Sequence, residues 1–375
     1  MENEVDIVIV GAGVAGCTAA IALAGSYSVV LVDQLSEPVE RIGECLPPAG
    51  RRILKQLDLL EHFEQAVGVD GSTRPLQNTG TQSWWGSEMV QVVDHLRNPD
   101  GFGWHLDRKA FETYLRNSAL QRGIQACWPA KLHRVLYEKD RWLVTATEGD
   151  QTHIFTAKFV IDASGRQSHF AKKSGIQRQQ SDRLVACWGI LPNAEENKLS
   201  SISACENGWW YSAALPGNKR VLAFQTDSDL LERGGIKTAT QLVELANRDP
   251  QIFKLLQRNP GNIDYRGTVA ANSTRLNEVA GPGWAALGDA ALSFDPLSSQ
   301  GMFNAMAGAM QLWELIRGTD LINNPVKAKQ EQFQAVYTAQ MNSIWAHYVK
   351  HKNIFYGQER RWREKEFWKR RQEKE

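Results

Sequence analysis

The sequence predicts an α/β protein in which a domain with a parallel sheet is interleaved with a domain built on a mixed β-sheet, followed by a C-terminal helical segment. The first observation is an apolar run over residues 7–10 that leads directly into a Gly-x-Gly-x-x-Gly turn and a helix of small residues. The second is a pair of later apolar runs, over residues 155–161 and 284–287, that also end in glycine-containing turns. The third is that the intervening segments are rich in Gly, Ser and Trp and lack the βαβ pattern.

The glycine turn spans residues 11–16 and lies between two strand patterns rich in β-branched residues. Gly11 permits the tight turn, Gly13 lets a pyrophosphate approach the backbone, and Gly16 lets the helix pack on the strand. The N-terminus of that helix offers free N–H groups to phosphates. Asp33 ends the second strand at the distance expected of an acid that binds a ribose 2′-OH. The motif therefore predicts a Rossmann-type domain that binds a dinucleotide, and the acid argues against NADP in this pocket.

Composition and charge exclude several classes of protein. The 375-residue chain has 43 Lys and Arg against 42 Asp and Glu, so its net charge does not favour nucleic acid or an anionic membrane as a partner. No apolar run approaches the length of a membrane span. The glycine motif begins too close to Met1 to leave room for a signal peptide, and the five cysteines lack the paired spacing of a metal site. We therefore expect a cytoplasmic protein with reduced thiols and no bound metal.

Helical patterns account for much of the remaining chain. Apolar residues recur at helical spacing over residues 51–63, 109–121, 238–257 and 302–316, and we expect one helix in each segment. Residues 358–375 carry eight Lys or Arg against five acids. We expect a solvated helix face there, with Trp362, Phe367 and Trp368 packed inward.

Four motifs occur in a characteristic order along the chain. They are the N-terminal glycine turn, Asp162-Ala-Ser-Gly165, Gly288-Asp289, and a Pro-x-x-x-x-Gly helix start at residues 296–301. This order resembles the flavoprotein hydroxylases with the p-hydroxybenzoate hydroxylase fold and the flavin-dependent halogenases built on the same core. The resemblance covers essentially the whole chain and implies FAD. It also implies a discontinuous FAD-binding domain (residues 1–66, 104–180 and 270–320), a substrate domain (67–103 and 181–269) and a C-terminal helical segment (321–375).

The same resemblance implies roles for individual residues. Asp33 is expected to hold the adenosine ribose, Arg108 to contact the FAD phosphates, and Asp289 to bond the ribityl–pyrophosphate region. The helix N-terminus near Gly301 is expected to face the flavin N1–C2=O edge, where it stabilises the anionic reduced flavin. The expected FAD-binding residues are Gly11, Gly13, Val14, Ala15, Gly16, Asp33, Gln34, Arg41, Glu44, Arg108, Leu132, Ser164, Gly165, Gly288, Asp289, Pro296, Gln300, Gly301 and Met302.

Five further segments resemble the halogenase-like maturation flavoproteins of cysteine tryptophylquinone enzymes, of the lysine oxidase, glycine oxidase and amine dehydrogenase types. These segments are residues 41–49, 82–87, 103–108, 208–216 and 355–371. The resemblance implies a monooxygenase that forms a flavin C4a-hydroperoxide and hydroxylates a tryptophan of a partner protein. The implied partners are the precursor of a quinoprotein oxidase or dehydrogenase, O2, and an electron donor that is NAD(P)H or a flavin reductase.

Halogenation is the main alternative. Tryptophan halogenases use a lysine that handles hypohalous acid, and this chain has none between Lys55 and Lys109. They also carry a glutamate where this chain has Ser298, and the residues at 209–211 depart from their Trp-x-Trp signature. Hydroxylation of a small aromatic metabolite and a non-catalytic, flavin-bound maturation chaperone are two further alternatives.

Aromatic side chains are the candidates for the substrate side. The segments 67–103 and 184–226 are expected to cover the flavin, and core packing is the competing role for each aromatic residue in them. His105 is the candidate catalytic residue, because it lies nearest a flavin motif. The candidate substrate-binding residues are Trp84, Trp85, Trp209, Trp210 and Tyr211.

Overall fold

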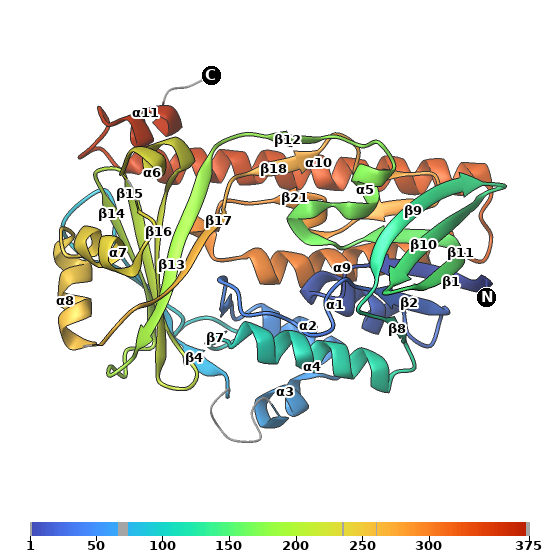
Figure 1. The fold of residues 1–375 in the computed structure, drawn as a ribbon, viewed down its shortest axis with the longest axis horizontal. Helices are drawn as coiled ribbons and strands as arrows, with labels where there is room; N and C mark the ends of the chain where they lie inside the picture. Colours follow the sequence, from blue (N-terminus) through green and yellow to red (C-terminus); the bar gives the residue numbers. More distant parts are fainter. Residues whose placement is uncertain (1, 67–73, 235, 260, 373–375) are drawn as a thin grey trace.

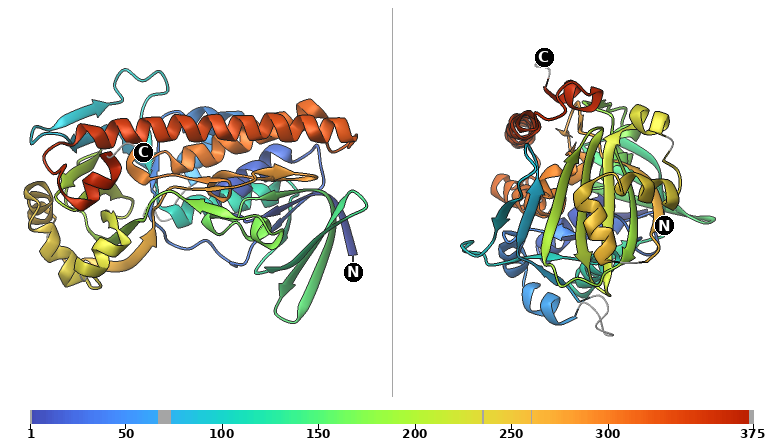
Figure 2. Two further views of the ribbon diagram at one scale, coloured as in Figure 1. Left: turned by 90° about the horizontal axis from the view of Figure 1, so that it is seen from above. Right: turned by 90° about the vertical axis from the view of Figure 1, so that its left-hand side faces the viewer.

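The computed structural model describes residues 2–66, 74–234, 236–259 and 261–372. Two sheets lie at opposite ends of the molecule, and one long helix, α10 (Lys327–Gln358), runs past both of them (Figures 1 and 2). Residues 67–73, at the start of the expected substrate segment, lie outside the described residues. Among the described residues, no helix combines the length and the apolarity that crossing a membrane would need.

The first sheet is the parallel sheet that the glycine motif predicts. Five of its strands run parallel to one another, which requires crossover connections between them. The antiparallel pair β9 (Lys131–Glu138) and β10 (Arg141–Glu148) extends from β11. The strand order is β19 (Ala280–Gly281), β20 (Trp284–Ala286), β11 (Gln151–Asp162), β1 (Glu2–Val10), β2 (Val29–Val32) and β8 (Gln125–Cys127).

Helices pack against this sheet and against one another. The first helix, α1 (Val14–Leu23), contacts both α4 (Arg108–Gln121) and α9 (Gly301–Thr319), which explains its almost wholly buried small residues. The shorter helical elements are α2 (Gly50–Gln56), α3 (Leu60–Ala66) and α5 (His169–Lys173). The short strands form two small sheets. One has the order β3 (Cys45–Leu46), β7 (Gly103–His105) and β4 (Leu76–Asn78), and the other has the order β12 (Arg178–Gln180), β18 (Thr274–Leu276) and β21 (Leu292–Ser293).

The second sheet is mixed, as expected, and draws strands from two separate parts of the chain. Only β14 and β5 pair in parallel, whereas the other neighbours are antiparallel. Its order is β17 (Asp264–Ala270), β13 (Leu184–Pro192), β16 (Lys219–Asp227), β15 (Gly208–Leu215), β14 (Leu199–Cys205), β5 (Gly80–Trp84) and β6 (Gln91–Asp94).

The two faces of the second sheet have different neighbours. Helices α7 (Ala239–Ala246) and α8 (Pro250–Arg258) cover one face, together with α6 (Ser228–Gly234) at its edge, while the end of α10 and α11 (Glu366–Gln372) pack on the other. Side chains alternate between the faces of a strand. Trp209 and Tyr211 therefore belong to the apolar cluster beneath α10 and α11, and Trp210 belongs to the cluster beneath α7 and α8.

Two expected helices are each divided in two. Residues 51–63 form α2 and α3, because Asp58 adopts a left-handed conformation (φ +52°) between them. Residues 238–257 form α7 and α8, because Asp249 caps a new helix whose first residue is Pro250. The C-terminal expectation holds for Phe367 and Trp368, which are fully buried, whereas Trp362 is half-buried.

Candidate functional site

A cavity of about 500 Å³ is lined by residues of both large sheets. The first sheet contributes the glycine turn, the end of β2 and the turn after β11, and the second contributes one face of β13, β15, β16 and β17. The expected FAD-binding residues that line it are Gly11, Gly13, Val14, Ala15, Asp33, Gln34, Arg41, Glu44, Arg108, Leu132, Ser164, Gly165, Asp289, Pro296, Gly301 and Met302. The other three, Gly16, Gly288 and Gln300, are not among its lining residues.

The three glycines of the N-terminal turn have different structural roles. Gly11 has φ +106°, and a Cβ added there would lie 2.4 Å from the carbonyl oxygen of Ala163. A Cβ added at Gly16 would lie 1.8 Å from the carbonyl oxygen of Gly11. A Cβ added at Gly13 meets nothing closer than 3.9 Å. Gly11 and Gly16 therefore build the turn, and Gly13 keeps the cradle at the start of α1 open, which fits the pyrophosphate of a dinucleotide.

Asp33 is oriented by backbone groups on both sides of the cavity rim. Its carboxylate accepts hydrogen bonds from the backbone N–H of Ala12 (2.6 Å) and Leu35 (2.8 Å). Arg116 Nη2 lies 3.3 Å from Asp33 Oδ2, and Arg116 Nε also donates to the carbonyl oxygen of Ala12 (3.0 Å). The acid that the motif assigns to a ribose is thus held in place before any ligand binds.

Sequence reasoning missed Arg116, although a signal was present. Arg108, Glu112 and Arg116 recur every four residues, so they lie on one face of α4. Glu112 is buried and pairs with Arg108 Nη2 at 2.6 Å and with Arg41 Nη2 at 3.5 Å. Arg108 Nη1 also donates to the carbonyl oxygen of Gly43 (2.8 Å). This face of α4 therefore ties the glycine turn to the loop that contains Arg41.

Glu44 is a buried carboxyl group of the cavity lining with a raised pKa. Its side chain is 3% exposed, and its Oε2 atom has no hydrogen-bond partner among the described residues. Burial raises the pKa of Glu44 from 4.5 to about 7. At neutral pH this group can therefore exist as a carboxylic acid or a carboxylate, which suits proton exchange.

The turn after β11 and the start of α9 complete the FAD-facing rim. Asp162 is fully buried and accepts hydrogen bonds from the backbone N–H of Ser164 (3.1 Å) and Ala171 (2.9 Å), while burial raises its pKa. Asp295 Oδ1 accepts from the backbone N–H of Leu297 (2.9 Å), which caps the turn before α9. The N-terminus of α9 thus reaches the cavity at Gly301, where it can stabilise a negative charge.

The candidate substrate residues separate into two groups. Trp209 and Tyr211 line the cavity, because both project from the same face of β15. Trp84, Trp85 and Trp210 are not among the lining residues. Trp85 packs with its ring 5.2 Å from Trp368, Trp210 lies on the opposite face of the sheet, and Trp84 is half-buried at the end of β5. The structure therefore places these three outside the cavity lining, with Trp85 and Trp210 in packing positions.

His105 lies behind the cavity wall instead of in it. It is fully buried, its Nε2 atom lies 2.9 Å from the hydroxyl of Ser200, and its Nδ1 atom has no partner among the described residues. Burial lowers the pKa of His105 from 6.5 to about 3, so its imidazole is neutral at physiological pH. His105 lies on β7, between β3 and β4, and is not among the residues that line the cavity, so its catalytic role stays a prediction.

Sequence comparisons identify relatives along nearly the whole chain. The family model described as tryptophan halogenase matches residues 87–375. The putative FAD-dependent oxidoreductase LodB of Marinomonas mediterranea is 26% identical over 373 residues, which cover 98% of this chain and 96% of that protein.

Solved structures share the same fold. The myxobacterial chondrochloren halogenase CndH superposes with a TM-score of 0.86 at 21% identity, covering 99% of this chain and 86% of that one. The peptidyl tryptophan dihydroxylase QhpG superposes with a TM-score of 0.73 at 21% identity, covering 98% and 79%. These likenesses confirm the predicted fold class.

Proposed function

The chain belongs to the tryptophan halogenase family, and we propose that it is an FAD-dependent monooxygenase that hydroxylates a tryptophan side chain of a partner protein. That it is an FAD-dependent oxidoreductase is confirmed by the family and by LodB. The observation that carries the finer proposal is a single cavity with a dinucleotide cradle at Gly13 and an aromatic wall at Trp209 and Tyr211.

The lining of the cavity favours oxygen insertion over halide chemistry. Ser298 lines the cavity where the halogenases carry a glutamate. The lysines in the lining are Lys131, in β9 of the first sheet, and Lys173, in α5, and none comes from residues 56–108. A side chain that could capture hypohalous acid is therefore missing from the stretch where the halogenases have theirs.

The protein's own residues would prepare the reaction as follows. FAD, when bound and reduced, activates O2 and supplies an electrophilic oxygen atom. Asp33, Gly13 and Arg108 would hold the dinucleotide, and the wall that contains Trp209 would exclude water from the reacting edge. Oxygen insertion at an indole ring carbon releases a proton, and Glu44 is the lining carboxyl group whose pKa suits accepting it.

A protein-bound substrate is favoured by one of the solved neighbours. QhpG is a peptidyl tryptophan dihydroxylase essential for tryptophylquinone cofactor biogenesis. By analogy, the partner of this chain would be the precursor of a quinoprotein oxidase or dehydrogenase, with O2 as cosubstrate and NAD(P)H or a flavin reductase as the electron donor. This proposal places the reaction before the quinone cofactor of the partner is complete.

Halogenation remains the second candidate function, and the halogenase relatives favour it. One experiment separates the two. The FAD-loaded protein is incubated with a flavin reductase, NADH, O2 and a tryptophan-bearing precursor polypeptide in chloride or bromide buffer. Intact mass measures the product, and 18O2 identifies the source of any oxygen. We expect oxygen from O2 in the polypeptide and no halogen. A halogenated product, or rapid turnover of free tryptophan without any effect of the precursor, would overturn the proposal.

A further inference from the structure

We propose that Tyr356, at the end of α10, is a positioning residue that joins the cavity wall to the loop before the flavin-facing helix. Tyr356 is fully buried and is not among the residues that line the cavity. Its hydroxyl donates to Asp295 Oδ2 (2.7 Å) and accepts from Trp209 Nε1 (3.1 Å). Asp295 and Trp209 both line the cavity, and they come from different parts of the fold. One hydroxyl thus fixes the separation between them.

Asp295 is held by α10 at two of its groups. Its backbone N–H donates to the hydroxyl of Tyr348 (2.9 Å), eight residues before Tyr356 on the same helix. Its Oδ1 atom caps Leu297, and its Oδ2 atom accepts from Tyr356. The side chain is 3% exposed, so water cannot replace a lost partner without a structural change. The orientation of the Pro296–Ser299 turn, and hence the start of α9, therefore depends on these two tyrosines.

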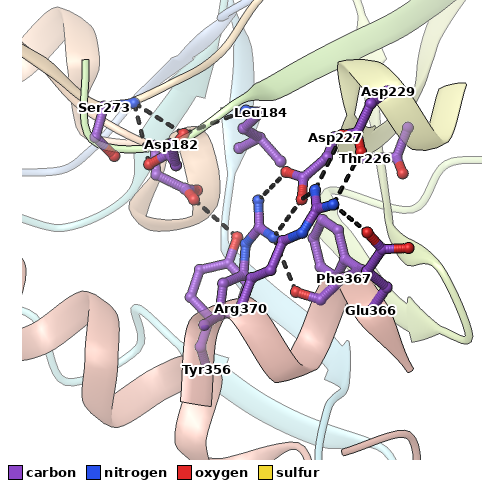
Figure 3. A network of polar contacts seen from close by, with 12 residues as sticks. Asp182, Leu184, Thr226, Asp227, Asp229, Ser273, Tyr356, Glu366, Phe367 and Arg370 are labelled. Carbon is purple, nitrogen blue, oxygen red and sulfur yellow. Dashed lines mark hydrogen bonds and ion pairs between the residues drawn. The ribbon is translucent and has the colours of Figure 1, made fainter. Parts of the chain in front are cut away.

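The C-terminal helix holds Tyr356 in place. The guanidinium of Arg371 lies 5.2 Å from the centre of the Tyr356 ring, and its Nη2 atom pairs with Asp227 Oδ1 at 2.6 Å. Gln372 Nε2 donates to the backbone carbonyl oxygen of Tyr356 (2.9 Å). Figure 3 shows the neighbouring Arg370 reaching toward Asp227 and Asp229 at the end of the second sheet.

This network attaches α11 to the second sheet through ion pairs, in addition to its apolar packing on the core. Asp227 is 1% exposed at the end of β16, so its pairing with two arginines fixes α11 to the sheet that supplies the cavity wall. Lys352 adds a second anchor of α10, because its Nζ atom lies 3.1 Å from Asp182 just before β13. The last residues of the chain thus support the hydroxyl that holds Asp295 and Trp209.

The chain offers a matched pair of variants. Tyr356→Phe removes the hydroxyl and leaves Asp295 Oδ2 and Trp209 Nε1 without a partner in a buried site. Tyr337→Phe removes an equally buried hydroxyl from the same helix, but that hydroxyl donates to the carbonyl oxygen of Ala286 (2.7 Å), which does not line the cavity. A general loss of packing would affect both variants alike, whereas a positioning role is specific to Tyr356.

The measurement is amide hydrogen exchange over residues 292–302, with the dissociation constant for FAD measured in parallel by flavin fluorescence. We expect Tyr356→Phe to accelerate exchange in this loop by about tenfold, because leaving a buried polar group without a partner costs a free energy that changes an equilibrium by a factor of about ten or more. We also expect it to weaken FAD binding severalfold. Tyr337→Phe should leave both quantities within about twofold of wild type. Equal behaviour of the two variants, or an unchanged loop in Tyr356→Phe, would overturn the proposal.

A third variant keeps the test decisive if Tyr356→Phe does not fold. Arg371→Met retains the tyrosine hydroxyl but removes one of the two cations that pair with Asp227 and the cation that lies against the Tyr356 ring. Exchange over residues 292–302 should therefore rise again, and an unchanged loop would refute the supporting role of α11. The inference rests on the FAD site and not on the identity of the substrate. Neither readout needs a substrate, so failure of the hydroxylation assay would leave this result unaffected.

Discussion

The two ends of the cavity are built in different ways. At the dinucleotide end, the cradle comes from a short stretch, residues 11–16, and from Asp33 one strand later. At the other end, the wall combines side chains from β13, β15, β16 and β17, and the indole of Trp209 is held by a helix that follows 147 residues later. The first end is specified by local sequence, and the second by strand register and by the C-terminal segment.

The largest expected effect is on FAD binding, and it distinguishes two glycines at the dinucleotide end of the cavity. Gly13→Val should fold, because a Cβ there has open space, but its side chain would occupy the pyrophosphate cradle. Overpacking of about 3 kcal/mol would weaken FAD binding by roughly 100-fold. Gly16→Ala should instead unfold the domain, since its Cβ would lie 1.8 Å from the carbonyl oxygen of Gly11. Flavin fluorescence titration and chemical denaturation measure the two outcomes. A Gly13→Val protein that retains FAD would contradict the assignment of the cradle.

The next effect concerns Glu44, which lies between the two ends. Because burial raises its pKa from 4.5 to about 7, the folded protein binds this proton more tightly than the unfolded chain. Its contribution to stability is therefore greatest below pH 4.5 and is lost as the pH rises through about 7, by up to about 3 kcal/mol. Glu44→Gln should flatten the dependence of unfolding free energy on pH between these limits in the FAD-free protein. Glu40→Gln is the control in the same loop, and identical profiles for wild type and Glu44→Gln would refute the buried carboxyl.

The smallest effect distinguishes the two faces of the second sheet. Trp209→Phe should slow product formation, because it alters the cavity wall, and Trp210→Phe should lower the free energy of unfolding by about 1–2 kcal/mol without slowing the folded enzyme. The comparison uses the rate per FAD bound, together with urea denaturation. If both variants slow the reaction equally, the division of roles between the faces is wrong.

The dinucleotide end of the cavity could be predicted well from the sequence, because the residues of each motif that forms it lie close together in the chain. The glycine turn, Asp33 and the start of α9 all reach the cavity. Alternation along β15 separates Trp209 from Trp210, but only the helices packed on each face decide which of the two meets the cavity. Trp85 and His105 are likewise fixed by long-range packing, against Trp368 and against β3 and β4.

Two further features that were not predicted, the division of one helix and the role of Arg116, are nevertheless indicated by local sequence patterns. The division between α7 and α8 follows from Asp249 and Pro250, a cap followed by proline that indicates a helix start. Arg116 could have been grouped with Arg108 by its spacing on α4. The link from Tyr356 to Asp295 spans 61 residues and carries no local pattern, so it required the folded arrangement.

The distance in sequence between α1 and α11 has a consequence for synthesis on the ribosome. The glycine turn and α1 are made first, yet β1 pairs with β11, whose residues are translated about 150 positions later. The wall around Trp209 receives the support of α11 only when Arg371 has left the exit tunnel, long after the glycine turn has emerged. A nascent chain that stops shortly before α11 would therefore contain every dinucleotide-binding motif and still lack a closed wall. Premature termination just before α11 would give a different defect from termination near the glycine turn: a cofactor site in an enzyme unable to protect its chemistry from water.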